Sequence, residues 1–140
     1  MRVAVDTNTL VSGLFFAGNE RRLLLAAFEG RVRLVLSAHV VEETFEVIEE
    51  TFRARPDLRD ALRLLEIVFG QAELVPEASY ALLVPRWAER VRDRKDAPVL
   101  ACASAAKVDL LVSGDTDLLV LRRVDGIPIV RTVDALRRIA

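Results

Sequence analysis

The chain has 140 residues, a net charge of −1 and 52% hydrophobic residues, enough for a sizeable core in a single domain covering residues 1–140. One Cys and one His leave no ligand set for a zinc site, and the near-zero charge gives no overall field that attracts nucleic acid. No uncharged stretch is long enough to span a membrane and the start lacks a signal-peptide layout, so we expect a cytoplasmic protein without membrane contact.

Short segments rich in Val, Ile and Leu predict five strands. They are 2–6, 32–37, 72–76, 109–115 and 127–131. Helical patterns fall at 20–29, 38–53, 57–69, about 86–92 and 97–107, with Gly30 and Gly70 expected to end the first and third. Strands that are buried on both faces and alternate with helices predict an α/β fold, a three-layer α/β/α sandwich around a parallel sheet.

Acidic residues gather near the predicted carboxyl ends of the strands. They are Asp6 after the first strand, Glu42, Glu43 and Glu46 in the helix that Ser37 is expected to cap, Asp96 before the helix leading into the fourth strand, and Asp115 and Asp117 after that strand. In open parallel sheets the ligand site lies outside the carboxyl ends of the strands. We therefore expect acids from distant parts of the chain to converge on one edge.

Each acid also has a purely structural explanation. Asp96 and Asp115 stand where helix N-caps are expected, and all three Glu residues lie off the apolar stripe of their helix, so periodicity does not choose among them. A cluster of carboxylates is costly, however, because two unit charges about 4 Å apart repel by about 4 kcal/mol at an effective dielectric near 20. Such a cluster needs a cation, and ligands that are all oxygen favour Mg²⁺ or Mn²⁺.

Three segments carry a resemblance to a known family. The segments VAVDTNTLVSGL, LVLSAHVVEET and RDRKDAPVLACASAAKVDLLVSGDTDLL, in this order, resemble the PIN-domain family of metal-dependent ribonucleases, in particular the small VapC-like toxins of bacterial toxin-antitoxin pairs. The resemblance runs from Met1 to about Arg131. It implies a five-stranded parallel sheet, a homodimer and an antitoxin protein as partner.

The resemblance also implies roles for individual residues. The metal-ligating and catalytic acids would be Asp6, Glu43, Asp96 and Asp115. Asn8 matches the polar residue that orients Asp6, and Ser113 matches a small hydroxyl residue before the last acid, whereas the role of Asp117 in the same turn stays open.

The resemblance implies hydrolysis of RNA phosphodiester bonds, with Mg²⁺ or Mn²⁺ as the cofactor that the acidic cluster favours. Bound ions would lower the pKa of a water molecule and neutralise charge in the transition state. Arg92, Arg94 and Lys95, just before Asp96, are candidates for contacts with RNA phosphates. The alternative for these cations is a solvated surface balanced by nearby acids.

A Mg²⁺-binding phospho-acceptor domain or a phosphatase-like domain is the competing function. A phospho-acceptor needs an adjacent acid pair at the end of the first strand and a Lys after the last strand, where this chain has VDTN and Thr132. A phosphatase with an Asp nucleophile needs a second acid two residues after Asp6, where this chain has Asn8. Both patterns match poorly.

Overall fold

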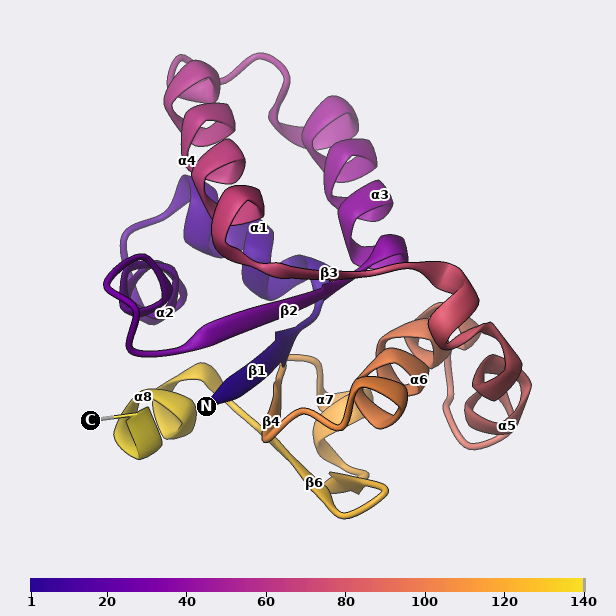
Figure 1. Ribbon diagram of the computed structural model, residues 1–140. Coiled ribbons are helices and arrows are strands. Elements are labelled where there is room, and N and C mark those ends of the chain that lie inside the picture. Colours follow the sequence, from indigo (N-terminus) through magenta and orange to yellow (C-terminus); the bar gives the residue numbers. More distant parts are fainter. Residues whose placement is uncertain (140) are drawn as a thin grey trace.

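Six strands form one sheet in the computed structural model, which describes residues 1–139 (Figure 1). The strands are β1 (Arg2–Val5), β2 (Arg33–Ser37), β3 (Glu73–Val75), β4 (Leu110–Val112), β5 (Arg123–Val124) and β6 (Ile127–Val130). Their order across the sheet is β3-β2-β1-β4-β6-β5. All neighbours are parallel except β5 and β6, so the five predicted strands and the predicted α/β class are confirmed.

The edge strand β5 adds a short antiparallel hairpin that the sequence analysis did not predict. Asp125 and Gly126 form its turn, with φ angles of 48° and 82°. A two-residue hairpin turn with positive φ at both positions favours Asp-Gly, because glycine has no Cβ to clash and Asp tolerates this region. The segment VDGI therefore held the signal for this hairpin.

Helices cover both faces of the sheet. They are α1 (Thr7–Phe15), α2 (Asn19–Phe28), α3 (Ala38–Val47), α4 (Leu58–Gln71), α5 (Val84–Ala88), α6 (Ala97–Ala106), α7 (Thr116–Leu119) and α8 (Thr132–Ile139). A π-helical turn, η1 (Ile48–Phe52), extends α3, and three 3₁₀ turns, η2 (Glu77–Ser79), η3 (Ala81–Leu83) and η4 (Arg94–Asp96), lie between β3 and α6. Figure 1 shows α1 to α4 on one side of the sheet and α5 and α6 on the other, which gives the predicted three layers.

All five predicted helices are present, with shifted ends. The third, α4, does not stop at Gly70 but continues to Gln71 and ends where Ala72 turns extended, because Gly70 is not in the left-handed conformation that ends helices. The fourth, α5, covers Val84–Ala88 rather than 86–92 and carries Pro85 in its first turn, where the fixed φ of proline favours the start of a helix. Helices α1 and α8 were not predicted, and α7 was indicated only by Asp115 as an expected N-cap.

Helix α1 lies among α2, α3 and α4 on its side of the sheet and is held close to α2. A Cβ added to Gly13 would lie 2.6 Å from Leu24 Cδ1 and 3.0 Å from the carbonyl oxygen of Glu20, so any larger residue would force Leu24 and the first turn of α2 to shift. The Arg21 guanidinium donates to the carbonyl oxygens of Gly13 (2.9 Å) and Leu14 (2.7 Å) at the end of α1. These contacts fix the first turn of α2 beside α1.

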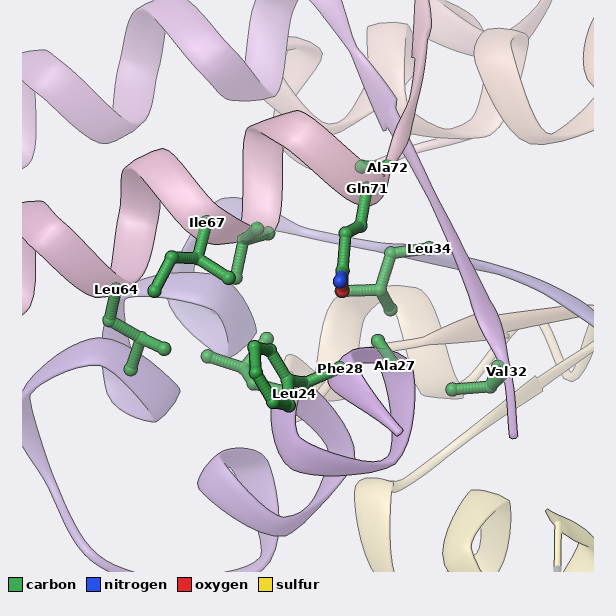
Figure 2. Close-up of a pocket in the computed structure, with 10 residues that line it drawn as sticks. Leu24, Ala27, Phe28, Val32, Leu34, Leu64, Ile67, Gln71 and Ala72 are labelled. Carbon is green, nitrogen blue, oxygen red and sulfur yellow. The ribbon is translucent and has the colours of Figure 1, made fainter. Parts of the chain in front are cut away.

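A second contact joins α2 to α4. Figure 2 shows Leu24 and Phe28 of α2 facing Leu64 and Ile67 of α4, with the Gln71 side chain reaching toward Leu34 of β2. The space left among them is about 20 Å³, room for a single water molecule. Within residues 1–139, no helix has the length and apolar character needed to cross a membrane.

Candidate active site

The site forms where the strand order reverses. From β1 the chain proceeds to β2 on one side, whereas β4 lies on the other side of β1. In doubly wound sheets the crevice at this point, outside the carboxyl ends of the strands, is where ligands bind. Val5 and Val112 are paired across β1 and β4, so the next residues, Asp6 and Ser113, meet at the edge of the sheet.

Asp6 is buried, with 7% of its surface exposed, and both carboxylate oxygens accept hydrogen bonds. Oδ1 accepts from the Thr9 N–H at 2.9 Å, which caps α1, and Oδ2 accepts from the Ser113 hydroxyl. The Ser113 oxygen accepts in turn from the Asp115 N–H at 2.9 Å. Burial raises the pKa of Asp6 above its ordinary value, although the bonds from Ser113 and Thr9 oppose that shift.

Asp96, Asp115 and Asp117 form a tight group of carboxylates. One oxygen from each lies within 4.8 Å of the other two. Asp115 caps the short helix α7 by accepting from the Asp117 N–H at 2.8 Å, so its structural explanation also holds. The side chains thus come from the segment before α6 and from the turn after β4, as the sequence analysis expected.

Asp96 has no such structural explanation. It makes no capping hydrogen bond to α6, and its Oδ2 is buried without a hydrogen-bond partner among residues 1–139. Burial, followed by the charges of Asp115, Asp93 and Asp117, raises its pKa to about 6. A carboxylate that lies close to two others and has one buried oxygen without a donor fits a bound cation.

The structure places Glu43 on α3, outside the three-carboxylate group. Its Oε2 lies 3.6 Å from Nε2 of His39, one turn earlier on the same helix. Glu43 is half-buried, whereas Glu42 and Glu46 are exposed, so Glu43 is the most enclosed of the three alternatives. Ser37 caps this helix as predicted, accepting from the Val40 N–H at 3.0 Å.

Asn8 is exposed and donates none of the hydrogen bonds that hold Asp6. Those bonds come from Thr9 and Ser113. Asn8 instead lines a groove beside Asp115. The sequence analysis therefore identified Ser113 as a partner of the acids but did not identify Thr9, because a backbone donor leaves no trace in residue type.

The predicted RNA-binding cations lie on the surface just before Asp96. Arg92, Arg94 and Lys95 are exposed and form no ion pair with any residue in the described range. The nearby Asp93 carboxylate accepts the backbone N–H of Lys95 at 3.0 Å instead of pairing with their side chains. The three cations are thus free to contact a ligand.

The groove beside Asp115 contains residues that sequence reasoning missed. It has a volume of about 620 Å³ and is lined by Asn8, Thr9, Ser12, Glu20, Gly114, Asp115, Thr116 and Thr132. Glu20 gave no signal in the sequence, because an acid in the first turn of a helix is sufficiently explained by the helix dipole.

The doubly wound sheet and the acids at its reversal point define an α/β protein with an acidic site at the carboxyl edge. The family model of the PIN domain matches residues 2–117. The chain therefore belongs to the PIN-domain family, and the resemblance seen in the sequence is confirmed.

Solved structures with the same fold are similar to this chain over nearly its whole length. PAE2754 from Pyrobaculum aerophilum has a TM-score of 0.72 and 18% identity, covering 99% of this chain and 89% of its own. VapBC2 from Rickettsia felis, bound to a promoter DNA fragment, has a TM-score of 0.63 and 15% identity, covering 92% and 97%. VapBC-1 from nontypeable Haemophilus influenzae has a TM-score of 0.62 and 16% identity, covering 95% and 99%. No curated protein sequence matches the chain.

Proposed function

We propose that this protein is a metal-dependent endoribonuclease that hydrolyses RNA phosphodiester bonds. The observation that carries the proposal is the buried, donor-free Oδ2 of Asp96 beside the carboxylates of Asp115 and Asp117. Membership of the PIN-domain family supports the nuclease assignment.

The acids proposed to hold one or two Mg²⁺ or Mn²⁺ ions are Asp6, Glu43, Asp96 and Asp115. When bound, such an ion supplies a water of lowered pKa and positive charge for the developing phosphorane. Ser113 holds the carboxylate of Asp6 and the backbone of Asp115 in one arrangement, so these two acids are oriented before any ion binds. Asp117 adds a third carboxylate within reach of Asp96 and Asp115 and supports the same ion.

The surface before Asp96 supplies the contacts to substrate in this proposal. The exposed side chains of Arg92, Arg94 and Lys95 carry three positive charges just before Asp96 in the chain and form no ion pair among residues 1–139. Cations in this position bind the phosphates that flank the cleaved bond and offset the repulsion between an RNA backbone and the acidic site.

We further propose that the protein acts in the cytoplasm as the toxin of a toxin-antitoxin pair, as a homodimer inhibited by an antitoxin protein. The fold shared with VapBC2 and VapBC-1 supports this assignment. Co-expression with candidate antitoxins followed by size-exclusion chromatography tests it, since a stable complex without ribonuclease activity is expected.

Incubation of the purified protein with end-labelled single-stranded RNA tests the enzymatic function. We expect cleavage with Mn²⁺ or Mg²⁺, none with excess chelator, and a loss of roughly 100-fold or more in Asp96→Asn, the scale of losing one charge-stabilising group at an active site. Glu66→Gln, on the exposed face of α4, is the matched control and should cleave like the parent. Cleavage that continues undiminished in chelator, or that survives in Asp96→Asn, refutes the proposal.

A further inference from the structure

The groove beside Asp115 is polar and negatively charged rather than basic. Of the residues that line it in the described part of the chain, only Glu20 and Asp115 are charged, and both are acids. Its other lining side chains are hydroxyls and one amide, contributed by Asn8, Thr9, Ser12, Thr116 and Thr132. With a cation on Asp115, Glu20 is the remaining uncompensated acid of the lining, so the part of the groove beside Glu20 disfavours a phosphate and suits a part of the substrate that donates hydrogen bonds.

Glu20 is held in the groove by the packing of α1 against α2. The absence of a side chain at Gly13 lets the backbone of Glu20 approach α1, and Arg21 ties the same turn of α2 to the end of α1. Arg21 is engaged with carbonyl oxygens and forms no ion pair with Glu20. Glu20 forms no ion pair with any residue between positions 1 and 139.

Building on the proposed function, we propose that this groove binds one unpaired nucleotide next to the cleaved phosphodiester and that Glu20 selects guanine. An ionised carboxylate offers two acceptor oxygens and no donor. Guanine presents two adjacent donors, N1–H and the N2 amino group, on its Watson–Crick edge, and both can be paired. Adenine and cytosine place a ring-nitrogen acceptor beside their amino group, which would face the carboxylate unfavourably, and uracil flanks its single N–H with carbonyl oxygens.

The size and placement of the groove agree with this ligand. A volume of about 620 Å³ lies within the roughly 300–1,000 Å³ usual for small-molecule sites. Asp115 belongs both to the groove and to the acid cluster, so a base held by Glu20 lies next to the reacting phosphate. Bases of single-stranded RNA are available for this kind of reading because they can be splayed out of the stack.

Cleavage of a random-sequence RNA pool, with cut sites mapped by sequencing, tests the inference. For the parent we expect guanine to be enriched at one position adjacent to the cut, by roughly 10-fold to 100-fold, the discrimination typical of a bidentate base contact. Glu20→Gln, which keeps the shape but presents a donor in place of one acceptor, should reduce this enrichment to about twofold or less, because the bidentate contact is lost. Glu66→Gln should leave it intact.

Inosine, which lacks the N2 amino group, gives a second readout. Replacing the preferred guanine by inosine in a defined RNA should slow the parent and have little effect on Glu20→Gln. Cleavage without base preference, or an equal preference in parent and Glu20→Gln, overturns the inference while the ribonuclease function stands. Equal loss of cleavage at all sequences together with weaker Mn²⁺ binding in Glu20→Gln also overturns it, because Glu20 would then be a metal ligand. No metal-dependent cleavage by the parent overturns the proposed function and this inference together.

Discussion

Replacing Asp96 by Asn should stabilise the metal-free protein at neutral pH. The folded protein raises the pKa of this carboxyl from 3.8 to about 6. A shift of about 2 units corresponds to roughly 3 kcal/mol in full, and partial exposure of Asp96 to solvent reduces the expected effect to about 1–2 kcal/mol. The amide removes one charge from the cluster and can donate to Asp115 or Asp117.

The stabilisation of Asp96→Asn relative to the parent should depend on pH, because Asp96 titrates at different pH values in the folded and unfolded states. Between pH 3.8 and about 6 the folded state binds more protons at Asp96 than the unfolded state does, so its contribution to stability is complete below pH 3.8 and is lost as the pH rises through 6. The difference between Asp96→Asn and the parent should therefore be close to zero below about pH 3, reach roughly a third of its full size at about pH 4.5 and be complete by about pH 7.

Urea denaturation with chelator, followed by circular dichroism at about pH 4.5 and about pH 7.5, measures this difference on either side of the raised pKa. Added Mn²⁺ should then raise the stability of the parent by mass action and that of Asp96→Asn much less. Glu66→Gln controls for the loss of one exposed negative charge. A variant that is less stable than the parent at the higher pH, or a difference that is the same at both pH values, would refute the reasoning about carboxylate repulsion.

Three further sets of substitutions test the RNA contacts, the hydrogen bonds between the acids and the packing of α1 against α2. Replacing Arg92, Arg94 and Lys95 together by Ala should weaken RNA binding and reduce the slope of log affinity against log salt by about 2, since each phosphate contact in single-stranded RNA contributes about 0.7; fluorescence anisotropy across a salt series measures it. Ser113→Ala should cost about 1–3 kcal/mol of unfolding free energy and lower cleavage, because it removes a donor to one acid and an acceptor from the backbone of another; urea melts and initial cleavage rates test both. Gly13→Ala should cost about 1–3 kcal/mol in a thermal melt, because the new methyl group overlaps α2.

Each of these changes has a control in the same chain. For the triple Ala variant of Arg92, Arg94 and Lys95, the control is a double Ala variant of Arg59 and Arg63, which lie on the exposed side of α4. If both variants reduce the salt slope equally, the proposed phosphate contacts are refuted. Ser113→Thr keeps the hydroxyl and should retain more activity than Ser113→Ala. Gly18→Ala should be nearly neutral, since no heavy atom lies within 4 Å of an added Cβ, and equal costs at Gly13 and Gly18 would contradict the close-approach argument.

The five parallel strands were predictable because each is a short apolar run bounded by turn residues or charges, whereas β5 is only the two residues Arg123 and Val124 and has no such run. Helix α1 was not, because TNTLVSGLF mixes β-branched residues, Ser and Gly and shows no polar face. It forms because Asp6 caps its start and because it is buried among α2, α3 and α4, a tertiary effect that no local pattern reports. The acids at the strand ends were predictable from topology. Thr9 and Glu20 were not, since one contributes a backbone donor and the other looks like an ordinary surface acid.

The acids of the site can come together only after β4 has been synthesised. Asp6 and Asp115 are separated by 115 − 6 = 109 positions, and they meet only because β4 inserts beside β1. At about 5–20 residues per second, a ribosome needs roughly 5–20 s to pass from the first to the second of these codons. During that interval the nascent chain contains β1 without its neighbour on one side, and the acids cannot gather. The acid cluster is therefore absent from the nascent chain until β4 has been synthesised and has paired with β1.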